Sequence, residues 1–291
     1  MSSDQNIANL LGMARTAQLG GNHEEALGYF NRVLEIDPKI SEAWVGKGKA
    51  AGWQSTLANL RLGEAIIAFG HAIATAEDPS KTATTTEVVD QMNRIVTALY
   101  SLARDQLVTY AALDNTWPSY LGQVGQMIDA LDEVRKWEPQ NRTTLENVVH
   151  LCKDNIEGYS FRDQYNNNMP AAHGITESYE RMLRDRLNQA VSALQTIDSS
   201  YNAPSIEKKK ADACFVVTAT MGDFNHPHVT TLREFRDRWL LQQSWGQAFV
   251  DAYYRHGPGM AALIEKRPLL RALSLRLLVQ PAALIARKRL S

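Results

Sequence analysis

Apolar residues recur at intervals of three and four along residues 7–197, which is the spacing of amphipathic helices. Two such faces follow one another between residues 7 and 38. The first contains Leu10, Met13, Ala14 and Ala17, and the second contains Ala26, Phe30 and Val33. Gly20 and Gly21 separate the two faces, and Asp37-Pro38 closes the second, because a residue that precedes proline avoids the helical region. The pattern predicts a pair of antiparallel helices.

A second copy of this pattern follows directly. Its first helix begins near Trp44, with Gly48 and Ala51 at the small positions. Its second helix contains Ala65, Phe69 and Ala72. We expect this helix to stop at Asp78-Pro79, by analogy with the first copy.

The two copies resemble the tetratricopeptide (TPR) repeat, in which small residues let two helices approach and an aromatic side chain fills the gap. This chain departs from that pattern at Lys47, where a leucine is usual, and in about five extra residues within Gly52–Asn59. The resemblance implies a mainly α fold, a TPR-like α-solenoid of antiparallel helix pairs. Stacked pairs leave a concave surface that binds peptides or helices of other proteins.

The helical period continues beyond residue 80, although the repeat signature fades. Further helices are predicted over 85–112, 119–137, 143–159 and 177–197, the third opening at a capping box, Thr143-Thr144-x-Glu146. The first of them carries an apolar stripe of Val88, Met92, Ile95, Leu99, Leu102 and Leu107. The polar stretch Arg162–Gly174 predicts a loop. We therefore divide this part into TPR-like repeats at 1–80 and a helical extension at 81–200.

Charge separates the two ends of the chain. Residues 1–200 hold 17 Lys and Arg against 25 Asp and Glu, whereas residues 201–291 hold 14 against 7. Between them lies a segment rich in turn formers and lysine, predicted to be a linker at 201–211, with a second domain at 212–291. The asymmetry favours two modules with different partners.

The second domain opens with a short apolar run, Phe215–Ala219, which must be buried as a strand or as the start of a helix. Gly222-Asp223 turns the chain, and His226-Pro227 opens a helix. The apolar stripe of that helix consists of Val229, Leu232, Phe235, Trp239 and Leu240. Arg233 and Asp237 stand four apart and are expected to pair.

These residues carry a second resemblance, to the CFI-box domain, a C-terminal module found in many bacterial proteins. It covers about residues 212–275. The matching positions are Cys214-Phe215-Val216, Thr218, Gly222-Asp223, His226-Pro227, Val229, Leu232-Arg233, Phe235-Arg236-Asp237, Leu240, Gly246, Ala248-Phe249 and Tyr253-Tyr254. The resemblance implies a small helical module with a short irregular or extended lead-in. It implies no activity.

The cluster of Cys214 with two histidines has three interpretations. Cys214 could be the nucleophile of a cysteine-dependent hydrolase, with His226 or His228 as base and Asp223 as the orienting carboxylate. The same four residues could bind zinc, with Asp223 as the fourth ligand. Alternatively the thiol packs and a histidine caps a helix, which the following apolar run favours. On that interpretation Cys214, Gly222, Asp223, His226, Arg233, Arg236 and Asp237 serve the structure of the module.

Residues 257–291 form a basic, leucine-rich tail in which Pro268 and Pro281 are expected to separate short helices. Its longest uncharged apolar stretch, 277–286, is half of what a membrane span requires. Such a tail can fold back on the acidic array, mediate self-association, or lie on an anionic membrane surface. The three lysines at 208–210 lack the aromatic and arginine interleaving of a nucleic-acid site, so nucleic acid is disfavoured.

Taken together, these patterns predict a non-enzymatic adaptor or scaffold with no cofactor. Its array would bind a protein partner through Asn9, Asn31, Trp44 and Lys47, and its basic module would anchor the assembly or self-associate. The alternatives are a membrane-associating effector acting through 257–291 and the hydrolase. Two distant cysteines favour a reducing compartment, and no signal-like segment begins the chain, so we expect a cytoplasmic protein, in part peripheral at the inner membrane.

Overall fold

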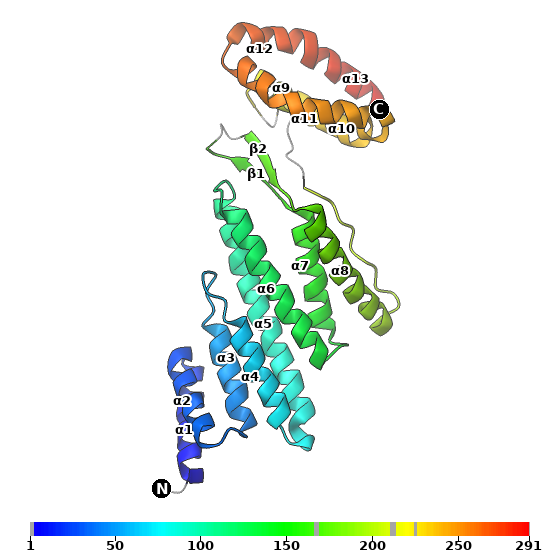
Figure 1. The fold of residues 1–291 in the computed structure, drawn as a ribbon. Coiled ribbons are helices and arrows are strands. Elements are labelled where there is room, and N and C mark those ends of the chain that lie inside the picture. Colours follow the sequence, from blue (N-terminus) through cyan, green and yellow to red (C-terminus); the bar gives the residue numbers. More distant parts are fainter. Residues whose placement is uncertain (1–2, 166–168, 210–213, 224–225, 291) are drawn as a thin grey trace. The chain divides into compact units, whose positions relative to one another are not determined.

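The computed structural model describes residues 3–165, 169–209, 214–223 and 226–290, and it is mainly helical (Figure 1). The chain forms two compact units. Unit 1 comprises Met1–Tyr159 and His173–Lys209, and unit 2 comprises Ser160–Ala172 and Lys210–Ser291. Each unit is described by itself.

Unit 1 contains eight helices among the residues described. They are α1 (Ser3–Leu19), α2 (His23–Ile36), α3 (Ser41–Trp53), α4 (Leu62–Thr75), α5 (Asp78–Tyr110), α6 (Thr116–Trp137), α7 (Arg142–Glu157) and α8 (Glu177–Ile197). Consecutive helices pack against each other in pairs, α1 with α2, α3 with α4, α5 with α6 and α7 with α8 (Figure 1). The core of the unit lies between these helices.

Helix α3 approaches its neighbours closely because glycine occupies three of its positions. A Cβ on Gly48 would lie 2.4 Å from the Phe69 ring, and one on Gly46 would lie 2.1 Å from the Phe30 ring. Both rings are fully buried. The predicted arrangement of small residues facing aromatic ones is therefore present at these positions.

Several local predictions for unit 1 are wrong. Met13 and Leu102 belong to the predicted apolar faces but are exposed, because Leu11 and Ala103 take the inward positions. Asp78-Pro79 does not end α4: proline fits the first turn of a helix, and here it begins α5. Helix α7 is capped by Asn141, whose side chain accepts a hydrogen bond from the Thr144 amide at 3.0 Å, and Thr143 lies inside the helix.

A polar cluster joins α5, α6 and α7. The Asp154 carboxylate accepts hydrogen bonds from the hydroxyls of Tyr100 at 2.5 Å and Tyr120 at 2.9 Å, and Arg104 lies 3.0 Å from it. Burial, followed by the neighbouring tyrosine and Asp154, raises the pKa of the Tyr100 hydroxyl. Both tyrosines are therefore neutral donors. The cluster fixes the register of three helices with one carboxylate.

The stretch predicted as a loop at Arg162–Gly174 contains two short strands, β1 (Tyr159–Asp163) and β2 (Met169–His173), which pair as a hairpin. Gly158 makes the transition from α7 with φ +77°, and a Cβ there would lie 2.2 Å from the His173 carbonyl oxygen. His173 Nε2 lies 2.6 Å from the Ala111 carbonyl oxygen, and its ring stacks on Trp117. The base of the hairpin is thereby fixed to the turn between α5 and α6.

The predicted linker is irregular through residue 209, and it is bound to unit 1. The Glu157 carboxylate accepts a hydrogen bond from the Glu207 amide at 2.9 Å, and the Glu157 carbonyl accepts one from the Lys209 amide at 2.6 Å. Lys208 pairs with Glu180 of α8 at 2.5 Å. These contacts hold the segment along the ends of α7 and α8.

Unit 2 is also helical. Besides most of the β1–β2 hairpin, its described elements are α9 (Phe215–Met221), α10 (Pro227–Arg238), the short 3₁₀ turn η1 (Leu240–Gln242), α11 (Ser244–Glu265), α12 (Pro268–Ser274), the π turn η2 (Leu275–Val279) and α13 (Gln280–Leu290). The apolar run after Cys214 is thus the start of a helix. Helix α9 packs on α11 and α12, and α10 packs on α13.

Within the tail, α11 ends before Pro268 as expected, but Pro268–Leu290 is one continuous helical stretch that does not break at Pro281. The π turn η2 stands directly before that proline, and the Gln280 amide donates to the Leu275 carbonyl. Proline has no backbone N–H to donate, and the wider turn lets the helix continue past it without that hydrogen bond. Pro268–Leu290 is therefore long and apolar enough to cross a membrane by length and composition, although its longest uncharged stretch is 277–286.

Candidate functional site

A hollow of about 430 Å³ opens on unit 1 where the first helices of three successive pairs lie next to one another. Helix α1 contributes two residues, α3 five and α5 three. The lining consists of Arg15, Gln18, Ser41, Glu42, Val45, Gly46, Lys49, Ser80, Thr84 and Glu87. Hydroxyl and charged groups dominate this set.

Two ion pairs connect the helices that line the hollow. Arg15 of α1 binds Glu42 of α3 with two parallel hydrogen bonds of 2.5 and 2.6 Å. Lys49 of α3 pairs with Glu87 of α5. Because such partly exposed pairs contribute less than about 1 kcal/mol, a ligand carrying the same charges can replace either partner at low cost.

Two residues that line the hollow belong to the packed interior, in contrast to its charged residues. Gly46 is buried, and its lack of a side chain leaves room for the Phe30 ring of α2. Val45 beside it is also buried. The backbone under the hollow is therefore fixed by the core.

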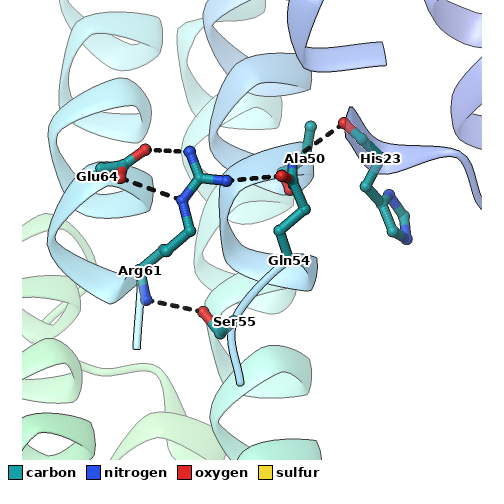
Figure 2. A network of polar contacts seen from close by, with 6 residues as sticks. All are labelled: His23, Ala50, Gln54, Ser55, Arg61 and Glu64. Atoms are coloured by element: carbon teal, nitrogen blue, oxygen red, sulfur yellow. Dashed lines mark hydrogen bonds and ion pairs between the residues drawn. The ribbon is translucent and has the colours of Figure 1, made fainter. Parts of the chain in front are cut away.

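A network at the opposite end of α3 holds the first two helix pairs together (Figure 2). Arg61, just before α4, donates to the Gln54 side-chain carbonyl at 2.7 Å and to Glu64 at 2.5 Å, and its amide donates to the Ser55 hydroxyl at 2.9 Å. The Gln54 amide group donates in turn to the carbonyls of His23 and Ala50. This network orders the extra residues between α3 and α4.

The electrostatics of the network agree with its geometry. The hydrogen bond from Arg61 lowers the pKa of the Glu64 carboxyl, against a smaller opposing effect of burial. Glu64 is therefore ionised across the neutral range. The extra residues between α3 and α4, which depart from the TPR pattern, are thus held by their own hydrogen bonds.

The four residues predicted to bind a partner do not meet in one place. Trp44 and Lys47 lie together: the Lys47 ammonium is 5.2 Å from the centre of the Trp44 ring, which stacks on His71 of α4. Neither lines the hollow of α1, α3 and α5. Asn31 lies partly exposed on α2.

Asn9 lines a second hollow, of about 790 Å³, on the outer face of α1 and α2. The exposed Met13 side chain lies in it, along with Gly12 and Tyr29. Met13 was predicted to belong to the apolar face of α1 because it stands three residues after Leu10 and four before Ala17.

Arg15, Glu42, Lys49 and Glu87 were not identified from the sequence. Their signal was present, because each stands on a first helix of a pair at a polar position that the apolar face does not use. Nothing in one chain distinguishes such positions from ordinary solvent-facing charges. Only the stacking of α1, α3 and α5 brings the four side chains to one hollow.

In unit 2, Cys214 lies just before α9 and is buried in an apolar cluster. The surrounding residues are Val217, Met221, Val229, Leu232, Phe235, Leu275, Val279, Ala282 and Ala286. An apolar setting of this kind is typical of a packing thiol. Nearby, the Tyr253 hydroxyl accepts a hydrogen bond from the Val216 amide at 3.0 Å, and burial, followed by Cys214, raises the pKa of that hydroxyl.

His226 caps α10, where its Nδ1 accepts a hydrogen bond from the His228 amide at 3.1 Å. The two imidazole rings lie 5.1 Å apart. Burial lowers the pKa of His228, and the charges of His226 and of Arg287 on α13 lower it further. Asp223 is exposed beyond the end of α9. The capping role expected for a histidine is therefore performed by His226.

The remaining residues singled out in this module occupy structural positions. Gly222 ends α9 with φ +70°, and Arg271 packs against it while donating to the Thr220 carbonyl at 2.9 Å. Asp237 pairs with the adjacent Arg236 at 2.7 Å, and Arg236 also donates to the Tyr254 hydroxyl. Arg233 is half-buried.

Metal binding has no support in the geometry. Over the part of the chain that the structure describes, no three His, Cys, Asp or Glu side chains gather closely enough to hold a metal ion. The zinc site considered for Cys214, His226 and His228 is therefore not formed.

Comparison with known proteins adds no identity. No family model matches the chain, and no curated protein matches its sequence. The resemblances to the TPR and CFI-box families stay predictions.

Proposed function

We propose that unit 1 is a TPR-like α-solenoid that binds a peptide or helix of another protein in the hollow of α1, α3 and α5. The protein would then be a non-enzymatic adaptor. The observation that carries this proposal is that three successive first helices contribute side chains to one hollow. Repeat arrays create binding surfaces in this way, because each pair adds one helix to the same face.

The charges of the hollow indicate the chemistry of its ligand. Glu42 and Glu87 would accept from a ligand's basic side chains, and Arg15 and Lys49 would bind its carboxylates. A polypeptide segment carrying both charge signs fits this set of charges. Ser41 and Ser80 donate their hydroxyl protons to the Ala72 and Glu77 carbonyls, so their oxygens can accept hydrogen bonds from backbone amides of a bound segment.

The hydrolase alternative has less support. A nucleophilic thiol needs access to substrate, and Cys214 is buried among aliphatic side chains. His226 Nδ1, a candidate base, is engaged in capping α10. We therefore do not propose a cysteine-dependent activity.

A selection of random peptides against the full chain tests the adaptor proposal. We expect recovered peptides to bind the wild type, and Glu42→Arg to weaken them about tenfold by removing an acceptor and repelling basic residues. The matched control is Glu146→Arg. Glu146 also pairs with an arginine and is equally exposed, at 45% against 46%, but lies on α7 outside the hollow.

Equal loss in both variants, or no loss in either, would show that the peptides bind elsewhere. Failure of the selection to enrich any peptide would also count against the proposal. A melting temperature within a few degrees of the wild type confirms that each variant is folded.

A further inference from the structure

Unit 2 exposes a row of large apolar side chains along α12, η2 and α13. Six residues of this stretch, Leu269, Leu273, Leu277, Leu278, Leu284 and Ile285, have exposed fractions between 50% and 86%. Isolated exposed leucines are ordinary on soluble proteins, but six large apolar side chains exposed on one helical stretch call for an explanation. We name these six side chains the leucine face.

The leucine face is distinct from the face that the same helices use for folding. Ser274, Val279, Ala283 and Ala286 are buried, and Leu275 and Ala282 are packed beside the Cys214 cluster. The buried set consists largely of small residues, whereas the exposed set consists of leucine and isoleucine. The larger apolar side chains therefore point away from the core of unit 2.

Basic residues accompany the exposed leucines along this stretch, and no acidic residue follows Glu265. Arg276 and Arg287 are exposed within the stretch, and α13 ends in the basic run Arg287-Lys288-Arg289, of which Arg289 lies over the Trp239 ring at 5.0 Å. The combination of an apolar row with flanking cations is complementary to an anionic lipid surface. It disfavours a second copy of the same face, because pairing two copies would bring like charges together.

The packing of the stretch also distinguishes lying on a membrane from crossing it. Pro268–Leu290 has the length and composition of a span, but α13 packs against α10 along the side opposite the leucine face. Crossing the membrane would remove that packing and expose Val229 and Leu232 of α10. Lying in the interface preserves it.

We propose that the leucine face docks unit 2 on the surface of an anionic lipid membrane, with α12, η2 and α13 lying in the plane of the interface. The apolar row enters the boundary between headgroups and acyl chains, and the arginines and lysine contact the phosphates. This inference is independent of peptide binding by unit 1.

Vesicle co-sedimentation of the full chain tests the docking. We expect binding to phosphatidylcholine vesicles with about 30% phosphatidylglycerol, and at least about tenfold weaker binding to pure phosphatidylcholine. The variant Leu273→Gln/Leu277→Gln/Leu284→Gln should lose binding at least about tenfold while keeping its fold, since these side chains face solvent. The matched control, Leu19→Gln/Ile67→Gln, changes exposed apolar residues of unit 1 and should bind like the wild type.

A fluorescent label reports which face meets the lipid. Cys152 and Cys214 are buried, so a cysteine introduced by Leu277→Cys is the accessible thiol and can carry an environment-sensitive dye. We expect the dye emission to shift to the blue on adding anionic vesicles. The same dye on Leu19→Cys, at a 90% exposed position of α1, should not respond.

Three outcomes would overturn the proposal. One is equal binding of the glutamine variant and the wild type. Another is lipid-free oligomerisation of the wild type that the glutamine variant abolishes, which would assign the face to self-association. The third is quenching by brominated lipids that is deepest at position 277 and shallow at 269 and 284, which would indicate a span.

Discussion

At the scale of single residues, the packing of unit 1 depends on positions that lack a side chain. Gly46, Gly48 and Gly52 of α3 each stand where a Cβ would overlap a buried side chain of another helix. Glycine destabilises a helix relative to alanine, and here the close packing of the helices offsets that loss of stability. Other helical glycines, such as Gly28 of α2, have open space around them. The same residue type therefore has opposite consequences at different positions.

Gly48→Ala is expected to lower the free energy of unfolding by about 1–3 kcal/mol, because the new methyl group overlaps the Phe69 ring. Gly28→Ala is the control, and it should raise stability by about 0.5–1 kcal/mol through helix propensity. Urea unfolding followed by circular dichroism measures both. If Gly48→Ala is stabilised like the control, α3 and α4 are less tightly packed than described.

The residue pattern predicted the contact of a small residue with an aromatic one at Gly48 and Phe69, whereas Gly46, which faces Phe30, was not identified. The pattern failed for Met13, since a spacing identifies a face but not whether another helix covers it. It also failed for the cap of α7, where two polar residues competed and Asn141 satisfied the Thr144 amide. A short stretch of sequence can contain several residues that could cap the same helix.

At the scale of elements, helices in unit 1 are joined by polar contacts that periodicity does not reveal. Asp154 connects α5, α6 and α7 through two tyrosine hydroxyls and Arg104. The helices themselves were predicted to within about three residues of their ends, except that α5 begins at Asp78, seven residues before its predicted start. The hairpin was missed because its strands are five residues long and lie within a polar stretch. The hollow was missed because its charges meet only after three helices stack.

Asp154→Ala is expected to destabilise unit 1 by about 3 kcal/mol, because it leaves the partly buried Arg104 and two hydroxyls without their acceptor. Asp129→Ala serves as control: Asp129 also pairs with an arginine, but its side chain is 64% exposed, so the loss should stay below about 1 kcal/mol. Urea denaturation compares the two. Similar losses would mean that the cluster contributes no more than a surface pair.

At the scale of the whole molecule, the two units differ in charge and in the groups that respond to acid. Unit 2 contains His228, whose pKa is lowered by burial and by the nearby charges of His226 and Arg287. The unfolded chain therefore takes up a proton at this residue at higher pH than the folded unit does. The contribution of neutral His228 is fully present above about pH 6.5 and is lost as the pH falls through the lowered pKa.

His228→Gln should reduce the loss of unit 2 stability between pH 7.5 and pH 5.5. Thermal unfolding at the two pH values measures this in the wild type and the variant. His150→Gln, on α7 of unit 1, is the matched control and should retain the wild-type decrease. An unchanged decrease in His228→Gln would show that other groups govern the acid response of unit 2.

The junction at Gly158 has an evolutionary consequence. Most core positions of unit 1 can exchange one aliphatic side chain for another and let neighbours readjust. Gly158 has no such route, because its left-handed backbone and the carbonyl of His173 exclude a side chain for two separate reasons. We therefore expect Gly158 to be retained while neighbouring positions change during evolution. Insertions in the hairpin after it would leave the end of α7 unchanged.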